Sequence, residues 1–131
     1  MSRGIIVLDA GHGQFGNPYP LLENTFEGTQ NFKLAARLKA CLEAKGFTVL
    51  LTRNCIEDDP SLEERGKLAG DSHADLFLSI HSNAAERESA DHPVVYYPIS
   101  GACSELATKI AKFVEETMET KEKGTGGIRW N

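Results

Sequence analysis

The sequence of 131 residues has few cysteines and no long apolar run. Its three cysteines are an odd number and include no Cys-x-x-Cys pair, which argues against a disulfide framework. No stretch of about 18 apolar residues is present, so we expect no membrane span. No block of lysine and arginine stands out, and a net charge of −5 argues against a nucleic-acid partner and against tight binding to anionic membranes. What is present is a composition near the globular average, with 40% hydrophobic and 25% charged residues.

Apolar patterning predicts an alternation of short strands and helices. The continuous apolar run at 5–8 suits a strand buried on both faces, and 75–80 is predicted to be a buried strand as well. The strands are predicted at 5–8, 47–52, 75–80 and 94–97, and the helices at about 29–45, 61–69 and 104–120. This order predicts an α/β fold, an open, twisted and mainly parallel sheet with helices on both faces. We expect residues 1–131 to form a single domain.

The first predicted helix should bury one stripe of side chains. At helical spacing this stripe consists of Leu34, Leu38, Cys41 and Leu42. Cys41 is therefore expected to be a small buried residue, and all three thiols to be structural or incidental. Gly46 is expected directly after the helix, where a left-handed backbone conformation ends many helices.

The later segments carry signals of the same kind. Ser61 and Glu64 fit a capping box at the start of the second helix. The third helix should bury a face made of Leu106, Ile110, Phe113 and Val114. Residues 124–131 are predicted to be a loop.

Two histidines follow apolar strand-like runs, in segments 8–13 (LDAGHG) and 78–84 (LSIHSNA). Open α/β sheets bind ligands at the carboxyl ends of their strands, which is where His12 and His81 are expected. Two such histidines and one acidic residue can form a catalytic zinc site with an open coordination position. We select Glu27 as the acid. The loop at about 11–28, which is rich in Gly, Pro and Asn, has a length that is usually functional.

Other residues near these positions are weaker candidates. Ser82 and Asn83 could bind substrate or orient the ligands through hydrogen bonds. His73 and His92 lie in polar segments and are not expected to bind metal.

Each candidate ligand also has an ordinary structural interpretation. A single histidine at a strand end is more often hydrogen-bonded than metal-bound, and Gly-His-Gly is a common turn composition. Glu27 alone could simply be an acidic residue favoured by the dipole at the start of a helix.

Five segments occur in an order that resembles one family. They are 8–13 (LDAGHG), 27–35 (EGTQNFKLA), 46–53 (GFTVLLTR), 61–65 (SLEER) and 74–84 (ADLFLSIHSNA). The chain is similar over most of its length to the zinc-dependent N-acetylmuramoyl-L-alanine amidases of type 3. The resemblance implies that His12, Glu27 and His81 bind Zn²⁺. It also implies hydrolysis of the amide between N-acetylmuramic acid and L-alanine, with bacterial peptidoglycan as the partner.

The family's general base is a second glutamate on a late strand, in a motif similar to Pro-Ala-Val-Leu-Val-Glu-x-Gly-Phe. The sequence contains no such motif, so we expect the family's final strand and helix to be absent, through truncation or natural shortening. Glu23 and Glu86 are possible substitutes for the base. The alternatives are a zinc-retaining, non-catalytic module that binds peptidoglycan, or a scaffold without zinc.

The place of action follows from the same resemblance. A peptidoglycan substrate implies a bacterial or phage protein that acts at the cell wall. Residues 1–4 lead directly into the first strand without the apolar stretch of a signal peptide. We therefore expect a released endolysin or a domain excised from a longer secreted enzyme, of unknown oligomeric state.

Overall fold

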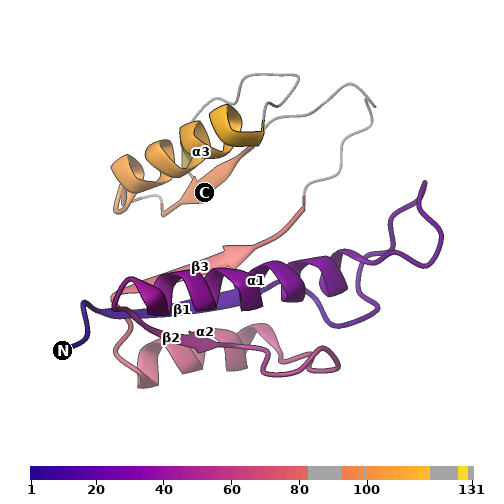
Figure 1. Cartoon of the computed structure of the whole chain (residues 1–131), viewed down its shortest axis with the longest axis horizontal. Helices are drawn as coiled ribbons and strands as arrows, with labels where there is room; N and C mark the ends of the chain where they lie inside the picture. Colours follow the sequence, from indigo (N-terminus) through magenta and orange to yellow (C-terminus); the bar gives the residue numbers. More distant parts are fainter. Residues whose placement is uncertain (83–92, 99, 119–126, 130–131) are drawn as a thin grey trace. The chain divides into compact units, whose positions relative to one another are not determined.

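The computed structural model describes residues 1–82, 93–98, 100–118 and 127–129 (Figure 1). Its elements in chain order are β1 (Ile5–Ala10), α1 (Glu27–Ala44), β2 (Thr48–Leu51), α2 (Leu62–Asp71), β3 (Leu76–Ile80), β4 (Val95–Tyr97), α3 (Ser104–Met118) and β5 (Gly127–Arg129). Each predicted strand and helix is confirmed, with ends displaced by one or two residues. The exception is β5, which lies where the sequence predicted a loop.

The chain divides into two compact units, Met1–Asn83 and Ala84–Asn131. Each unit is described by itself, and the expectation of a single domain stays a prediction. Among the described residues, no helix is both long enough and apolar enough to cross a membrane.

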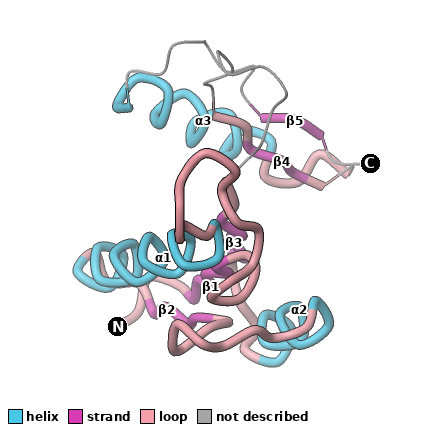
Figure 2. The backbone as a smooth tube through the Cα atoms, turned by 90° about the vertical axis from the view of Figure 1, so that its right-hand side faces the viewer, coloured by secondary structure: helices cyan, strands magenta, loops and turns pink. Residues whose placement is uncertain are grey.

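The first unit contains a three-stranded parallel sheet in the order β2-β1-β3. Strand β1 is central, and Val7 and Leu8 are completely buried, as predicted for this strand. Helices α1 and α2 lie on opposite faces of the sheet (Figure 2). The sheet therefore has the predicted α/β architecture, and its three carboxyl ends meet at one edge.

Strand β3 is less buried than predicted. Its residues alternate between half-buried and exposed, and Phe77 is 40% exposed. The reason is its place at the edge of the described sheet, where it pairs only with β1.

The main core lies between the sheet and α1. Strand β1 contributes Ile6, Leu8 and Ala10, which cluster with Ala35 of α1 and Val49 of β2. The side chains that alternate with them, including Asp9, point to the other face of the sheet, which α2 covers.

Helix α1 buries a different stripe from the predicted one. Leu34 is 53% exposed and Cys41 is exposed, so the predictions for both residues are wrong. The buried or half-buried stripe is instead Glu27, Asn31, Ala35, Leu38 and Leu42. Two polar residues occupy its first turns because they face the end of the sheet and not the apolar core. Cys55 and Cys103 are likewise exposed, and no thiol forms a disulfide.

The predicted helix-end signals are confirmed. Gly46 follows α1 with a φ of 93°, and its N–H donates to the Glu43 carbonyl while the N–H of Phe47 donates to Leu42. At the start of α2, the Ser61 side chain and Glu64 form a complete capping box.

The second unit is a parallel β-α-β arrangement in which α3 connects β4 to β5. Helix α3 buries Ala107 and Ala111. The predicted face is only partly confirmed, because Leu106 and Phe113 are 40% and 67% exposed. Small alanine side chains allow the helix to approach its strands closely, and they displace the expected stripe.

A buried ion pair joins the elements at the carboxyl edge of the first sheet. The Asp9 carboxylate accepts hydrogen bonds from Arg65 Nη1 at 2.9 Å, from the Thr52 hydroxyl at 2.8 Å and from the Ser79 hydroxyl at 2.7 Å. Both partners of the pair are at least nine-tenths buried. The carboxylate therefore connects β1 to α2, to β3 and to the residue that follows β2.

We predict that Arg65→Met lowers the free energy of unfolding by about 3–5 kcal/mol, because it leaves the Asp9 carboxylate buried without its charged partner. Urea unfolding followed by circular dichroism measures this loss. A loss below about 1 kcal/mol would show that the pair is as weak as an exposed one.

The same carboxylate makes stability depend on pH. Burial alone would raise the pKa of Asp9, but hydrogen bonds from Ser79, Thr52 and Arg65 and the charge of Arg65 outweigh burial and lower it. This stabilisation is complete above the ordinary pKa of about 3.9 and is lost as pH falls through the lower pKa of the folded state. We predict that Asp9→Asn is less stable than the parent at neutral pH and that the difference narrows below about pH 4. If the difference in the free energy of unfolding between Asp9→Asn and the parent stays constant in acid, Asp9 is not the source of this pH dependence.

Candidate functional site

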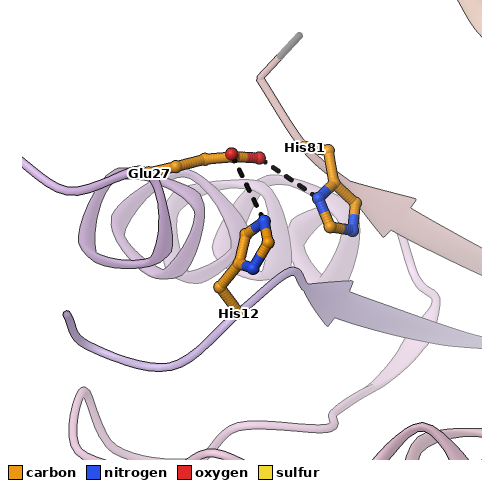
Figure 3. A group of neighbouring side chains, drawn as sticks. All are labelled: His12, Glu27 and His81. Atoms are coloured by element: carbon orange, nitrogen blue, oxygen red, sulfur yellow. Dashed lines mark hydrogen bonds and ion pairs between the residues drawn. The ribbon is translucent and has the colours of Figure 1, made fainter. Parts of the chain in front are cut away.

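Three residues distant in sequence come together at the carboxyl edge of the first sheet: His12, Glu27 and His81 (Figure 3). His12 Nε2 lies 3.3 Å from Glu27 Oε2, and His81 Nδ1 lies 3.1 Å from Glu27 Oε1. The two imidazole rings meet edge to face at an angle of 83°. The potential ligand atoms of the three side chains all lie within 4.8 Å of one another.

Each of these side chains occupies the end of a regular element. His12 follows β1 after Gly11, His81 directly follows β3, and Glu27 is the first residue of α1. The backbone at His12 has a φ of 64°, a left-handed conformation that costs free energy for a residue other than glycine. The Arg65 guanidinium holds this turn by donating to the carbonyls of Ala10 at 2.7 Å and His12 at 3.2 Å.

The Glu27 carboxylate is the buried part of the cluster, with 1% of the residue exposed. It accepts hydrogen bonds from the Asn17 amide, from the Ser82 backbone N–H at 2.7 Å and from the Asn31 amide at 3.3 Å. Burial alone would raise the pKa of Glu27, but these hydrogen bonds outweigh burial and, with His12, lower it. The carboxylate is therefore ionised at neutral pH.

The start of α1 rests on the loop that precedes it and not on a capping side chain. Phe26 offers no side-chain cap. Instead, the backbone N–H groups of Glu27 and Gly28 donate to the carbonyls of Asn17 and Gly16, each at 3.1 Å. A Cβ at Gly28 would overlap the Gly13 carbonyl, so only glycine permits this close approach. The missing cap explains why the sequence placed the helix start two residues late.

Gly11 directly precedes His12 in the chain and lies against the His81 ring. Its N–H donates to the Ile80 carbonyl at 3.0 Å, just before His81, and its own carbonyl accepts from the Asn31 amide at 3.2 Å. A Cβ at Gly11 would overlap the His81 ring. Because glycine has no side chain, the His81 imidazole can occupy this space.

The other predicted site residues have different outcomes. Ser82 lies beside the cluster, where its N–H binds Glu27 and its hydroxyl accepts from Tyr19 at 3.0 Å. His73 is exposed and outside the cluster, and Glu23 is exposed in the loop before α1. Asn83, Glu86 and His92 lie outside the described residues.

Sequence reasoning missed the buried polar side chains that support the cluster, namely Asn31, Arg53 and Arg65, each at most 5% exposed. Asn31 could have been found from its spacing, because it lies four residues after Glu27 and shares its helix face. The arginines gave no such signal, since their carbonyl partners are set by the tertiary structure.

Comparison with known proteins decides the family. A family model described as N-acetylmuramoyl-L-alanine amidase matches residues 6–130. The chain belongs to this amidase family.

Individual amidases show the same similarity. The N-acetylmuramoyl-L-alanine amidase LytC of Bacillus subtilis (strain 168) is 30% identical over 122 residues, which cover 91% of this chain. LytH of Staphylococcus aureus, named a probable cell wall amidase, is 39% identical over 98 residues, which cover 70% of this chain. The chain spans only 24% and 30% of the lengths of these two relatives.

The fold also matches a solved amidase. The catalytic domain of CwlV, an N-acetylmuramoyl-L-alanine amidase from Bacillus (Paenibacillus) polymyxa var. colistinus, is similar with a TM-score of 0.80 and 25% identity. The match covers all of this chain and 70% of the CwlV chain. It confirms the α/β class predicted from the sequence.

We predict that Gly11→Ala displaces the His81 ring from Glu27, because the new methyl group takes the space of the imidazole. The ring nitrogen shifts of His81, measured by NMR, should change. Gly66→Ala is the matched control, since a Cβ at Gly66 meets no atom within 4 Å. That change should leave the His81 signals in place and stabilise α2 by about 0.5–1 kcal/mol. Unchanged His81 signals in Gly11→Ala would contradict the role of this glycine.

Proposed function

We propose that this chain is a zinc-dependent amidase that hydrolyses the bond between N-acetylmuramic acid and L-alanine in bacterial peptidoglycan. The observation that carries the proposal is the cluster of His12, Glu27 and His81 in a member of the amidase family. The same proposal places its action at the bacterial cell wall.

The donor set fits zinc. Zinc accepts imidazole nitrogen and carboxylate oxygen, and catalytic sites use three protein ligands and leave one position open. Ligand atoms bonded at about 2.1 Å in a tetrahedron lie roughly 3.4 Å apart. His12 Nε2 lies 3.3 Å from Glu27 Oε2 and His81 Nδ1 lies 3.1 Å from Glu27 Oε1, and one ligand atom from each of the three side chains lies within 4.8 Å of the other two. His12, Glu27 and His81 are therefore the residues that would hold the ion.

The surroundings of Glu27 favour the ionised carboxylate that metal binding needs. The lowered pKa of Glu27 keeps its carboxylate ionised, and Asn17, Asn31 and the Ser82 N–H fix its direction. Such support from neighbouring groups raises metal affinity.

The exposed side of the cluster suits a polymeric substrate. The side chains of His12 and His81 are 37% and 46% exposed, whereas Glu27 is covered. When bound, zinc supplies Lewis-acid activation of water and of the scissile carbonyl. The Tyr19 and Ser82 hydroxyls are hydrogen-bonded to each other at the same edge of the sheet. We propose that these two residues and Asn83 contact the substrate.

A second candidate function is a module that retains zinc and binds peptidoglycan without hydrolysis. Within the described ranges, the cluster contains a single carboxylate, Glu27, and zinc would occupy it. A separate general base is therefore not assigned to any described residue.

We predict that the chain binds about one zinc ion and releases a new L-alanine amino terminus from a defined muropeptide. His81→Ala should abolish cleavage and lower the zinc content, because it removes one of three ligands. His73→Ala is the matched control and should leave both unchanged, since His73 is exposed and outside the cluster. Metal content by mass spectrometry and product analysis by chromatography check both quantities.

The outcomes separate the two candidates. Cleavage that depends on His81 supports the hydrolase. Bound zinc and sedimentation with purified peptidoglycan, without turnover, support the binding module. A chain in which mass spectrometry finds no bound zinc refutes both the zinc-dependent hydrolase and the zinc-retaining binding module.

A further inference from the structure

Arg53 is a buried cation that lies two residues beyond β2, with 1% of the residue exposed. Its hydrogen bonds all go to backbone carbonyls. Nη1 donates to Gly28 at 2.7 Å and to Gly11 at 3.3 Å, and Nη2 donates to Ile56 at 2.8 Å. The guanidinium also lies over the Phe32 ring, 5.4 Å from its centroid. Among the described residues, no carboxylate forms an ion pair with it.

The two carbonyls that share Nη1 belong to the segments that carry the cluster. Gly11 directly precedes His12, and Gly28 directly follows Glu27. One nitrogen therefore connects the turn after β1 to the first turn of α1. Without this connection, only the Asn31 amide would join the Gly11 carbonyl to the start of the helix.

The burial of this cation is unfavourable in itself. Transferring a charged group from water costs free energy unless it is paired or fully hydrogen-bonded, and Arg53 Nε has no partner in the described structure. A methionine or leucine would fill the same space at lower cost. The position therefore needs the donors of the guanidinium and not its volume.

We propose that Arg53 is a positioning residue of the amidase centre, which fixes the backbone before His12 against the backbone after Glu27 and so sets the separation of two metal ligands. The measurements of zinc affinity and of the Co²⁺ spectrum rest on the proposed zinc function. The measurement of amide hydrogen exchange does not, because it uses metal-free protein.

The test uses Arg53→Met, which removes every donor, and Arg53→Lys, which keeps the charge but not the planar fork of donors. The control is Val49→Ala in β2, a core residue that is 5% exposed and lies outside the cluster. Three quantities are measured: zinc affinity by competition with a chromophoric chelator, the absorption spectrum of bound Co²⁺, and amide hydrogen exchange of Glu27 and Gly28 in metal-free protein.

For Arg53→Met we expect zinc affinity to fall roughly 10- to 100-fold, with an altered Co²⁺ spectrum. Arg53→Lys should lose less affinity than Arg53→Met. Val49→Ala should melt at a lower temperature but keep the parent's affinity and spectrum. This contrast separates positioning from general destabilisation. Parent-like affinity and spectrum in a folded Arg53→Met would overturn the proposal.

Two further outcomes remain decisive. If the parent binds no zinc, the proposed function fails, and hydrogen exchange alone tests the positioning role. Faster exchange at Glu27 and Gly28 in Arg53→Met but not in Val49→Ala supports that role, and equal exchange overturns it. If Arg53→Met does not fold, the same comparisons are made with Arg53→Lys, and a parent-like Arg53→Lys overturns the proposal.

Discussion

The buried pair of Asp9 and Arg65 is the interaction on which the first unit depends. Its carboxylate binds hydroxyls that belong to β3 and to the residue after β2, and its guanidinium continues to the carbonyls of Ala10 and His12. Desolvation of two charges consumes much of their mutual attraction, so such a pair contributes little net stability. What it contributes is position, because any shift of the strand ends would leave a charge without its partner.

The parallel sheet explains why a site forms at this edge. Residues that follow β1 and β3 must emerge side by side, whereas Glu27 reaches them only because the loop after His12 returns the chain to the same edge. Glycine permits this return at two points. Gly28 lets the helix touch the loop, and Gly11 leaves room for the His81 ring. The cluster is therefore a product of backbone approach as much as of side-chain chemistry.

The sequence predicted those parts of the molecule that follow from a local pattern. Apolar runs located the strands and, with them, His12 and His81 as strand-end residues. It failed where a polar side chain is buried: the i,i+4 spacing of Asn31 from Glu27 was overlooked, and Arg53 and Arg65 have carbonyl partners that only the tertiary structure brings near. The same failure displaced the stripe of α1 and gave Cys41 the wrong environment. Strand β5 was missed because three residues after a glycine-rich segment carry too little apolar periodicity.

The charges buried in the first unit are balanced, but they are not paired alike. Asp9 and Glu27 are negative, and Arg53 and Arg65 are positive. Arg65 neutralises Asp9 directly, whereas Arg53 gives its hydrogen bonds to backbone carbonyls. Glu27 is left facing two imidazoles and neutral amide donors, with its pKa lowered so that it stays ionised. A buried anion in these surroundings attracts a cation that can enter from the exposed side of the histidines, and a dication with affinity for imidazole nitrogen meets that requirement. The arrangement of internal charge, together with the three candidate ligands, thus supports the proposal of a zinc ion at this position.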